Sequence, residues 1–296
     1  MLQIQNLSKT YGNGVQALRD VSLDIPRGMF GLLGPNGAGK STLMRTIATL
    51  QEADTGSVTL DGLDVLREKE AVRGMLGYLP QEFGVYPKVS AEAMLDHFAV
   101  LKGLIDKSTR QQTVESLLRM TNLWDVRKRK LGTYSGGMRQ RFGIAQALLG
   151  DPKLVIVDEP TAGLDPLERN RFLDLLAEIG ENVVVILSTH IVEDVSDLCQ
   201  KMAIISHGQV HAEGEPSELR TELRGRVWRK TIPKTELDEH RRRFSVISDR
   251  LAAGRRAIHI LADEAPEGFE AREPDLEDVY FSTLSRADDQ PTSAAA

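Results

Sequence analysis

Short apolar runs alternate with longer amphipathic stretches over the first two thirds of the chain. The segments Met29–Leu33, Leu154–Val157 and Val183–Leu187 are almost continuously apolar, which is typical of strands that are buried on both faces of a sheet. Residues 166–179, between the last two runs, carry apolar side chains at helical spacing. This alternation predicts an α/β fold in which helices cover a parallel sheet.

One region inside this pattern contains helices without strands. Residues 91–101 and 109–120 both have helical spacing, and no strand pattern separates them. We therefore predict a helical insertion into the sheet domain at about residues 89–150.

The pattern changes again beyond about Gly214, where arginine and lysine become frequent. Residues 226–232 and 257–261 are predicted strands, and residues 274–284 a closing helix. The chain then divides into three predicted parts: a main domain at 1–215, a small α+β accessory domain at 216–285, and a tail at 286–296. We expect the tail to be disordered because it is polar and alanine-rich.

The composition supports a globular protein and argues against some classes of partner. Of 296 residues, 41% are hydrophobic and 27% charged, so the chain can bury a substantial core. A net charge of −6 disfavours a protein that coats nucleic acid, and we expect no nucleic-acid partner. The apolar runs are far shorter than the ~20 residues that span a bilayer. We therefore expect that this protein does not cross a membrane by itself.

A phosphate loop is the first motif with chemical meaning. Gly34-Pro-Asn-Gly-Ala-Gly-Lys-Ser41 follows a predicted strand and precedes a predicted helix, the context that this pattern requires. Its glycines let backbone N–H groups curl around phosphate oxygens. Lys40 is expected to reach the β- and γ-phosphates, Ser41 to bind Mg²⁺, and Thr42 to bond the next phosphate. The predicted nucleotide-binding residues here are Gly34, Pro35, Asn36, Gly37, Ala38, Gly39, Lys40, Ser41 and Thr42.

Two acidic residues end the apolar run Leu154–Val157. Carboxylates at the end of a buried strand are costly without partners, and alternation along the strand gives Asp158 and Glu159 different directions. Asp158 suits the Mg²⁺ shell. Glu159 suits the attacking water, as general base or orienting group.

The order of these and later motifs resembles the ATP-binding subunits of ABC transporters. The resemblance covers about residues 2–215. It implies a P-loop ABC ATPase domain with a parallel-sheet core, an antiparallel β portion and a helical subdomain, and it implies ATP and Mg²⁺ as cofactors. The motifs that carry it are the phosphate loop, Gln81, Ser135-Gly-Gly137, Asp158-Glu159, Gly163-Leu-Asp-Pro166 and Ser188-Thr-His190.

The resemblance also implies roles for three isolated residues. Tyr11 would stack on adenine, Gln81 would sense Mg²⁺ and the γ-phosphate while facing the membrane partner, and His190 would contact the γ-phosphate. Each role suits its side chain: an aromatic face for a base, an amide for a metal or water, and an imidazole donor for developing charge. Glu159, His190 and Gln81 are thus the predicted catalytic residues, and Ser41, Gln81 and Asp158 the predicted Mg²⁺ ligands.

Ser135-Gly-Gly137 forms a second predicted helix start that can face phosphate. In the family, two ATP-binding domains pair head to tail, and this motif of one domain caps the ATP of the other. Ser135, Gly136 and Gly137 are therefore expected to bind nucleotide in trans.

The motif departs from the usual Leu-Ser-Gly-Gly-Gln, because this chain has Tyr134-Ser-Gly-Gly-Met138. Phosphate contacts from Ser135 and the glycine backbone are unaffected, although Met138 changes the polarity beside them. This variant resembles the daunorubicin-resistance-type branch of exporters. That branch often ends in a segment similar to Pro274-Asp-Leu-Glu-Asp-Val-Tyr-Phe281.

The leading hypothesis is an ATP-hydrolysing subunit of an ABC exporter at the cytoplasmic face of the cell membrane. Its partners would be separate permease subunits and a second copy of itself or a paralogue. The alternative is a soluble ABC ATPase with a regulatory or assembly role. Action on ribosomes or DNA is disfavoured, because the chain has one cassette and no long coiled coil interrupts it. The transported substrate, the identity of the permease and the role of the accessory domain stay open.

Overall fold

The computed structural model describes residues 1–181, 183–252 and 254–289. Its centre is a six-stranded sheet in the order β10-β9-β3-β8-β7-β6. The strand pairs from β9 to β6 are parallel, and only β10 runs antiparallel to its neighbour. The α/β fold predicted from the apolar runs is confirmed. The strands are β3 (Gly28–Leu33), β6 (Leu76–Leu79), β7 (Leu154–Asp158), β8 (Val184–Thr189), β9 (Lys201–Ser206) and β10 (Gln209–Gly214).

A second, antiparallel sheet has the order β2-β1-β4-β5 and matches the antiparallel portion that the family resemblance implied. Helix α1 (Lys40–Ile47) buries Leu43, Met44 and Ile47 in a core shared by this sheet and one face of the central sheet. The phosphate loop is therefore attached to a helix that both sheets hold. The strands are β1 (Leu2–Thr10), β2 (Gln16–Ile25), β4 (Thr55–Leu60) and β5 (Leu63–Asp64).

The opposite face of the central sheet packs against α6 (Pro166–Gly180) and α7 (Val192–Leu198). Their buried side chains, such as Phe172 and Val195, form one cluster with Val157 and Leu187 of the strands. Since Val157 directly precedes Asp158, this core also supports the acidic strand end.

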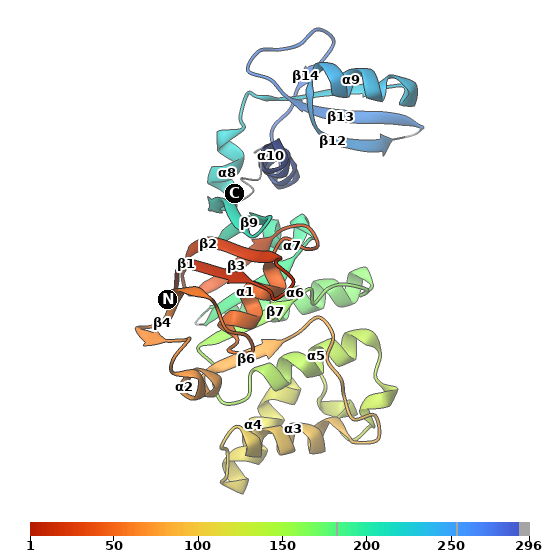
Figure 1. The fold of residues 1–296 in the computed structure, drawn as a ribbon. Coiled ribbons are helices and arrows are strands. Elements are labelled where there is room, and N and C mark those ends of the chain that lie inside the picture. The colour runs from red at the N-terminus through yellow and green to blue at the C-terminus, as the bar shows by residue number, and fades with distance from the viewer. Residues whose placement is uncertain (182, 253, 290–296) are drawn as a thin grey trace.

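The helical insertion lies at one end of the molecule (Figure 1). It contains α3 (Ala91–Leu101), α4 (Lys107–Met120) and α5 (Gly136–Ala147), with 3-10 turns at Trp124–Val126 and Leu131–Thr133. These elements share a separate apolar cluster that includes Leu95, Leu118 and Phe142. A short helix, α2 (Lys69–Gly74), precedes β6 on the side of the antiparallel sheet.

The C-terminal part contains a four-stranded sheet in the order β12-β13-β11-β14. The predicted strand at 226–232 begins one residue later, at Val227, and the predicted strand at 257–261 lies within β13. The predicted helix at 274–284 begins at Leu276. The division into domains stays a prediction. The elements are α8 (Pro216–Glu222), β11 (Val227–Ile232), a 3-10 turn at Lys234–Glu236, α9 (Leu237–Arg243), β12 (Ser245–Ala252), β13 (Arg255–Leu261), β14 (Glu270–Ala271) and α10 (Leu276–Asp289).

The last helix extends further than the sequence pattern indicated. Because α10 continues to Asp289, the first four residues of the predicted disordered tail are helical. The remaining tail, residues 290–296, lies outside the described residues. Buried side chains such as Ala287 explain the extension, because they continue the apolar face of the helix.

Helix α10 lies between the C-terminal sheet and the main body of the chain (Figure 1). Leu276, Val279 and Tyr280 are buried in the same cluster as Val192 and Val195 of α7. The C-terminal segment therefore completes the core beneath the central sheet.

We predict that Leu276→Ala lowers the free energy of unfolding by about 2–5 kcal/mol, the usual cost of removing a buried leucine. Leu276 is 3% exposed. The control is Leu251→Ala on β12, where the side chain is 66% exposed and the expected change stays within about 0.5 kcal/mol. Urea titration followed by circular dichroism measures both. Equal stabilities of the two variants would show that α10 is not part of the core.

Candidate functional site

The phosphate loop forms the turn from β3 into α1, and its shape depends on two close glycines. Gly39 precedes the helix with a φ of 106°, in the left-handed region that side chains rarely adopt. A Cβ at Gly39 would also lie 2.5 Å from the carbonyl oxygen of Ala17. Gly37 has a φ of 81°. The backbone can therefore curl as the motif predicted only because these positions lack a Cβ.

The Lys40 ammonium is buried inside the loop. Its Nζ donates to the carbonyl oxygens of Gly34 at 2.6 Å and Pro35 at 3.2 Å, and lies 3.8 Å from Oε1 of Glu159. Burial lowers the pKa of Lys40, and the charges of Glu159 and Asp158 oppose this shift. The loop thus holds a buried cation whose hydrogen-bond partners within the loop are neutral carbonyl oxygens.

Asp158 and Glu159 lie at the carboxyl end of β7, and both are buried. Burial raises the pKa of Asp158; Glu159 adds to this shift, whereas Ser188 and the charge of Lys40 counteract it. A carboxylate in this position would be stabilised by a nearby cation. Glu159 has a φ of 48°, an uncommon conformation for a residue with a side chain. Its N–H donates to the Ser188 carbonyl at 2.8 Å, which holds this turn against the end of β8.

His190 contacts the second oxygen of Glu159. Nδ1 of His190 and Oε2 of Glu159 are 2.6 Å apart, and a carboxylate can only accept, so Nδ1 carries the proton. The imidazole is about half exposed, with 53% of the side chain accessible. His190 therefore stays about half exposed while it holds one oxygen of Glu159.

These elements surround a cavity of about 460 Å³. Most predicted nucleotide and metal residues line it: Tyr11, Pro35, Asn36, Gly37, Ala38, Gly39, Lys40, Ser41, Thr42, Gln81, Asp158 and Glu159. The sequence thus anticipated residues that lie up to 148 positions apart (159 − 11) in one cavity. Gly34, His190 and Ser135-Gly-Gly137 are predicted site residues that do not line it.

Part of the cavity wall, next to the phosphate loop, was not predicted from the sequence. It consists of Val15, Gln16, Ala17, Arg19, His207 and Gly208. They belong to the region of β2 and to the turn between β9 and β10. Gly208 donates to the Ala38 carbonyl at 2.9 Å and accepts from the Arg19 N–H at 2.8 Å. The turn thereby braces the loop against β2. The only signal in the sequence was the dipeptide His207-Gly208, since these contacts depend on how the sheets pack.

Tyr11 lies at the outer edge of the cavity and is 37% exposed. Its hydroxyl shares a hydrogen bond of 3.0 Å with Oγ1 of Thr42 and donates to Oε1 of Gln51 at 3.1 Å. The hydroxyl is anchored while the ring borders the cavity. This arrangement is compatible with the predicted stacking on a base.

The predicted Mg²⁺ ligands Ser41, Gln81 and Asp158 all line the same cavity. Among the residues that the structure describes, no cluster of three or more His, Cys, Asp or Glu side chains could hold a metal alone. Mg²⁺ commonly takes one or two carboxylates together with phosphate oxygens and water. The donor set therefore fits Mg²⁺ that arrives with a nucleotide.

Ser135 caps α5, where its Oγ accepts from the Met138 N–H at 3.2 Å. Ser135 and Gly136 are exposed, and none of the three motif residues borders the chain's own cavity. Gly137 is closely packed, because a Cβ there would collide with the Glu168 side chain. Arg141 of the same helix pairs with Glu168 at 3.1 Å. The helix start is thus held against α6, while Ser135 and Gly136 stay exposed.

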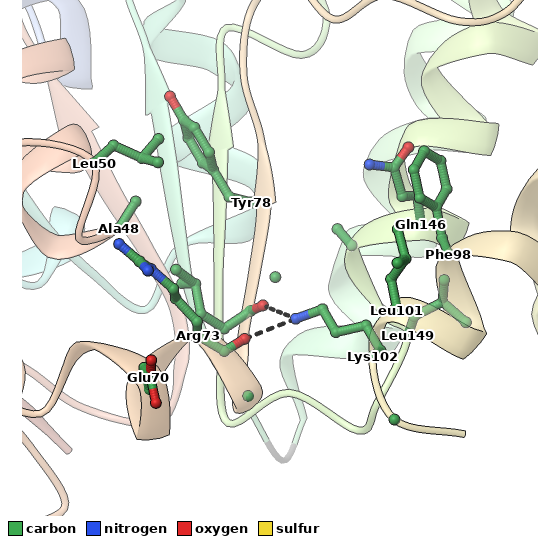
Figure 2. Close-up of a pocket in the computed structure, with 15 residues that line it drawn as sticks. Ala48, Leu50, Glu70, Arg73, Tyr78, Phe98, Leu101, Lys102, Gln146 and Leu149 are labelled. Carbon is green, nitrogen blue, oxygen red and sulfur yellow. Dashed lines mark hydrogen bonds between the residues drawn. The ribbon is translucent and has the colours of Figure 1, made fainter. Parts of the chain in front are cut away.

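A larger cavity of about 670 Å³ lies between the helical insertion and the sheets. Figure 2 shows Leu50, Arg73 and Tyr78 on one side of it and Phe98, Leu101 and Gln146 on the other. Nζ of Lys102 crosses between the two sides and donates to the carbonyl oxygens of Arg73 at 2.8 Å and Leu76 at 2.9 Å. Burial lowers the pKa of Lys102. No carboxylate within the described ranges forms an ion pair with it.

Among the described residues, no helix has the combination of length and apolar character needed to cross a bilayer.

Comparison with known proteins agrees with the geometry. A protein-family model described as "ABC transporter" matches residues 18–162. The linearmycin resistance ATP-binding protein of Bacillus subtilis is 36% identical over 227 residues, which cover 76% of this chain and 72% of that protein. The daunorubicin/doxorubicin resistance ATP-binding protein of Streptomyces peucetius is 34% identical over 273 residues, or 92% of this chain and 80% of that protein. The resemblance to this branch is confirmed.

A solved structure shows the same architecture. It is a dimeric ATP-binding cassette in a post-hydrolysis state with bound ADP and Pi. The two chains superpose with a TM-score of 0.66 at 27% sequence identity, over 73% of this chain and 98% of that chain.

Proposed function

Because this chain belongs to the ABC transporter family as an ATP-binding subunit, we propose that it binds Mg²⁺-ATP at the phosphate loop and hydrolyses it to drive export. The observation that carries the proposal is the cavity itself. It brings the buried cation of Lys40, the carboxylates of Asp158 and Glu159, and the ring of Tyr11 together from three separate segments. Such convergence of charge at the carboxyl edge of a parallel sheet suits phosphoryl chemistry.

Nucleotide binding would exchange ligands that the chain now supplies to itself. Lys40 would move from the Gly34 and Pro35 carbonyls to the β- and γ-phosphates, which are stronger partners for an ammonium. Tyr11 would stack on adenine, and Thr42 would turn from the tyrosine hydroxyl towards phosphate. Ser41, Gln81 and Asp158 would hold Mg²⁺, which neutralises phosphate charge when bound.

Glu159 and His190 are the proposed hydrolytic pair. Departure of Lys40 would free Oε1 of Glu159 to accept a hydrogen bond from the attacking water, while His190 retains Oε2. The exposed nitrogen of His190 would then face the γ-phosphate. Because the imidazole holds one carboxylate oxygen, the other has a defined direction.

The chain supplies only part of a complete site. Ser135, Gly136 and Gly137 do not line its own cavity, so we propose that they cap ATP held by a second ATP-binding subunit. The similar solved cassette is a dimer. A full set of hydrolytic residues in one chain supports pairing of two copies.

The cavity around Lys102 is the proposed docking site for a permease subunit. Leu50 and Leu101 are 63% and 70% exposed at its rim, and Lys102 offers a positive charge without an acidic partner among the described residues. An amphipathic helix with apolar residues and a carboxylate would complement both features. The subunit would thereby be held at the cytoplasmic face of the cell membrane. Since two relatives are named for drug resistance, the cargo proposed is a small molecule that the permease selects.

Glu159→Gln tests the hydrolytic assignment. Turnover of ATP should fall by roughly 10²–10⁴-fold, because the amide keeps the shape but cannot accept a proton. Binding of ATP, measured by calorimetry, should persist. The control is Glu178→Gln on the exposed face of α6, which should leave both unchanged. Turnover of Glu159→Gln at the wild-type rate would assign the water to another residue.

The trans contact is tested with two defective chains, Lys40→Ala and Gly136→Asp. A Cβ at Gly136 meets nothing within 4 Å, so the aspartate can be accommodated and acts by its charge. If the contact is in trans, each site of a mixed dimer combines the phosphate loop of one chain with the Ser-Gly-Gly segment of the other. One site then carries both substitutions, and the other site carries neither. We therefore expect single-turnover ATP hydrolysis in the mixture and little in either parent.

Heterodimer formation is verified by affinity tags of two kinds. A tagged heterodimer that stays as inactive as its parents would show that the Ser-Gly-Gly segment acts within its own chain.

The docking site is tested with Leu101→Arg. Co-purification with a multi-span membrane protein from detergent extracts should be lost, because a charge replaces an apolar contact, while ATP binding by the subunit is retained. Leu251→Arg on β12 is the matched control, since this leucine is 66% exposed and remote from the cavity. Undiminished co-purification of Leu101→Arg would place the permease elsewhere.

A further inference from the structure

A buried ionic cluster joins the two segments that carry the proposed hydrolytic pair to the start of α6. Asp194, in the first turn of α7, is 0% exposed. Its Oδ2 accepts from Oγ1 of Thr161 at 2.7 Å, and its Oδ1 accepts from Nε of Arg169 at 2.7 Å. Arg169 also reaches Glu193 at 3.3 Å. None of these residues belongs to a motif that sequence analysis identified.

The cluster involves the same two segments as the Glu159–His190 hydrogen bond. Thr161 follows Glu159 by two residues, and Asp194 follows His190 by four. The two segments are therefore joined twice, by Glu159 with His190 at 2.6 Å and by Thr161 with Asp194 at 2.7 Å. One contact between two loops leaves a pivot, whereas two contacts fix their relative orientation.

Arg169 adds the third segment. It lies in the first turn of α6, where its N–H donates to the Asp165 carbonyl at 2.9 Å. Asp165 itself caps the helix, and its Oδ1 accepts from the Glu168 N–H at 2.9 Å. The ion pair between Arg169 and Asp194 thereby connects the start of α6, after Gly163-Leu-Asp, to the helix that follows His190.

Stability alone is a weak explanation for this cluster. Replacing a buried ion pair with apolar side chains of similar volume is often neutral or stabilising, because the desolvation of both charges is avoided. A hydrogen-bonded network fixes the relative orientation of the segments more strictly than apolar packing, since each hydrogen bond sets a distance and an angle. The thiol of Cys199 also lies close enough to Asp194 to be affected by its negative charge. Burial and this charge together raise the pKa of Cys199 to about 12.

We propose that Thr161, Arg169 and Asp194 are positioning residues for ATP hydrolysis. They hold the Glu159 turn, the start of α6 and the His190 loop in one fixed arrangement, and they contact neither the nucleotide cavity nor the phosphate loop. The inference rests on the proposed roles of Glu159 and His190. Losing the network should misplace these two groups and slow the chemical step without weakening ATP binding, since small misplacements can cost about 10²-fold in rate.

The test compares Thr161→Val and Asp194→Asn in the full-length chain. Thr161→Val removes one hydroxyl at nearly constant volume, and Asp194→Asn removes the charge that Arg169 requires. The control is Asp96→Asn on α3, where Nε of Arg110 donates to Oδ1 of Asp96 at the same 2.7 Å but far from the hydrolytic pair. ATP affinity comes from calorimetry, turnover from single-turnover phosphate release, and thermal midpoints from circular dichroism.

We expect both network variants to lower turnover at least about tenfold, with the Kd for ATP within twofold of wild type and turnover of Asp96→Asn unchanged. Wild-type turnover in folded Thr161→Val and Asp194→Asn would overturn the inference. A loss of ATP affinity proportional to the loss of turnover would also overturn it, because it indicates general loosening. If Asp194→Asn does not fold, Thr161→Val decides alone.

Glu159→Gln, measured in parallel, separates this inference from the proposed function. If Glu159→Gln loses turnover while Thr161→Val retains it, only the positioning role is wrong. If Glu159→Gln keeps wild-type turnover, the hydrolytic assignment is wrong and the positioning role fails with it.

Discussion

The burial of opposite charges at one edge of the central sheet is the constraint on which the rest of the structure depends. Lys40 enters from the phosphate loop, and Asp158 and Glu159 enter from β7. An isolated charge at such a position would be strongly unfavourable, so the three groups require one another until a ligand replaces part of the set. The elements that carry them must therefore be held at defined distances. The two apolar cores on either face of the sheet provide this support.

The two faces of the central sheet support different parts of the site. On one face, α1 and the antiparallel sheet hold the phosphate loop, and the turn at Gly208 braces it through the Ala38 carbonyl. On the other face, α6 and α7 hold the Glu159 turn and the His190 loop through apolar packing and the Asp194 cluster. Helix α10 extends this second core and joins it to the C-terminal sheet, where His259 and Asp278 form a buried hydrogen bond of 2.8 Å. The C-terminal segment is therefore mechanically connected to the hydrolytic side of the site.

The helical insertion carries part of two surfaces that we propose other subunits complete. One is the Ser135-Gly-Gly137 segment, and the other is the cavity around Lys102. The insertion has its own apolar core, so α5 can carry Ser135 outwards without disturbing the nucleotide cavity. The same separation leaves a groove beside the sheets that Lys102 crosses. A second ATP-binding subunit and a permease helix would complete these two surfaces. In the proposed function, transport would require this chain, a second ATP-binding subunit and a permease.

The sequence by itself determined the features that depend on consecutive residues. The phosphate loop, the acidic strand end and the Ser135 cap follow from local backbone needs, such as the positive φ of Gly39 and the side-chain oxygen before α5. The sheet class followed from the same local patterns. Only the tertiary structure decided which distant side chains meet. Thr161, Arg169 and Asp194, the wall at His207 and Gly208, and the packing of Tyr280 depend on how the helices lie on the sheet. Nothing in the local sequence distinguishes Asp194 from an exposed acid in a first helical turn, because its burial comes entirely from elements remote in the chain.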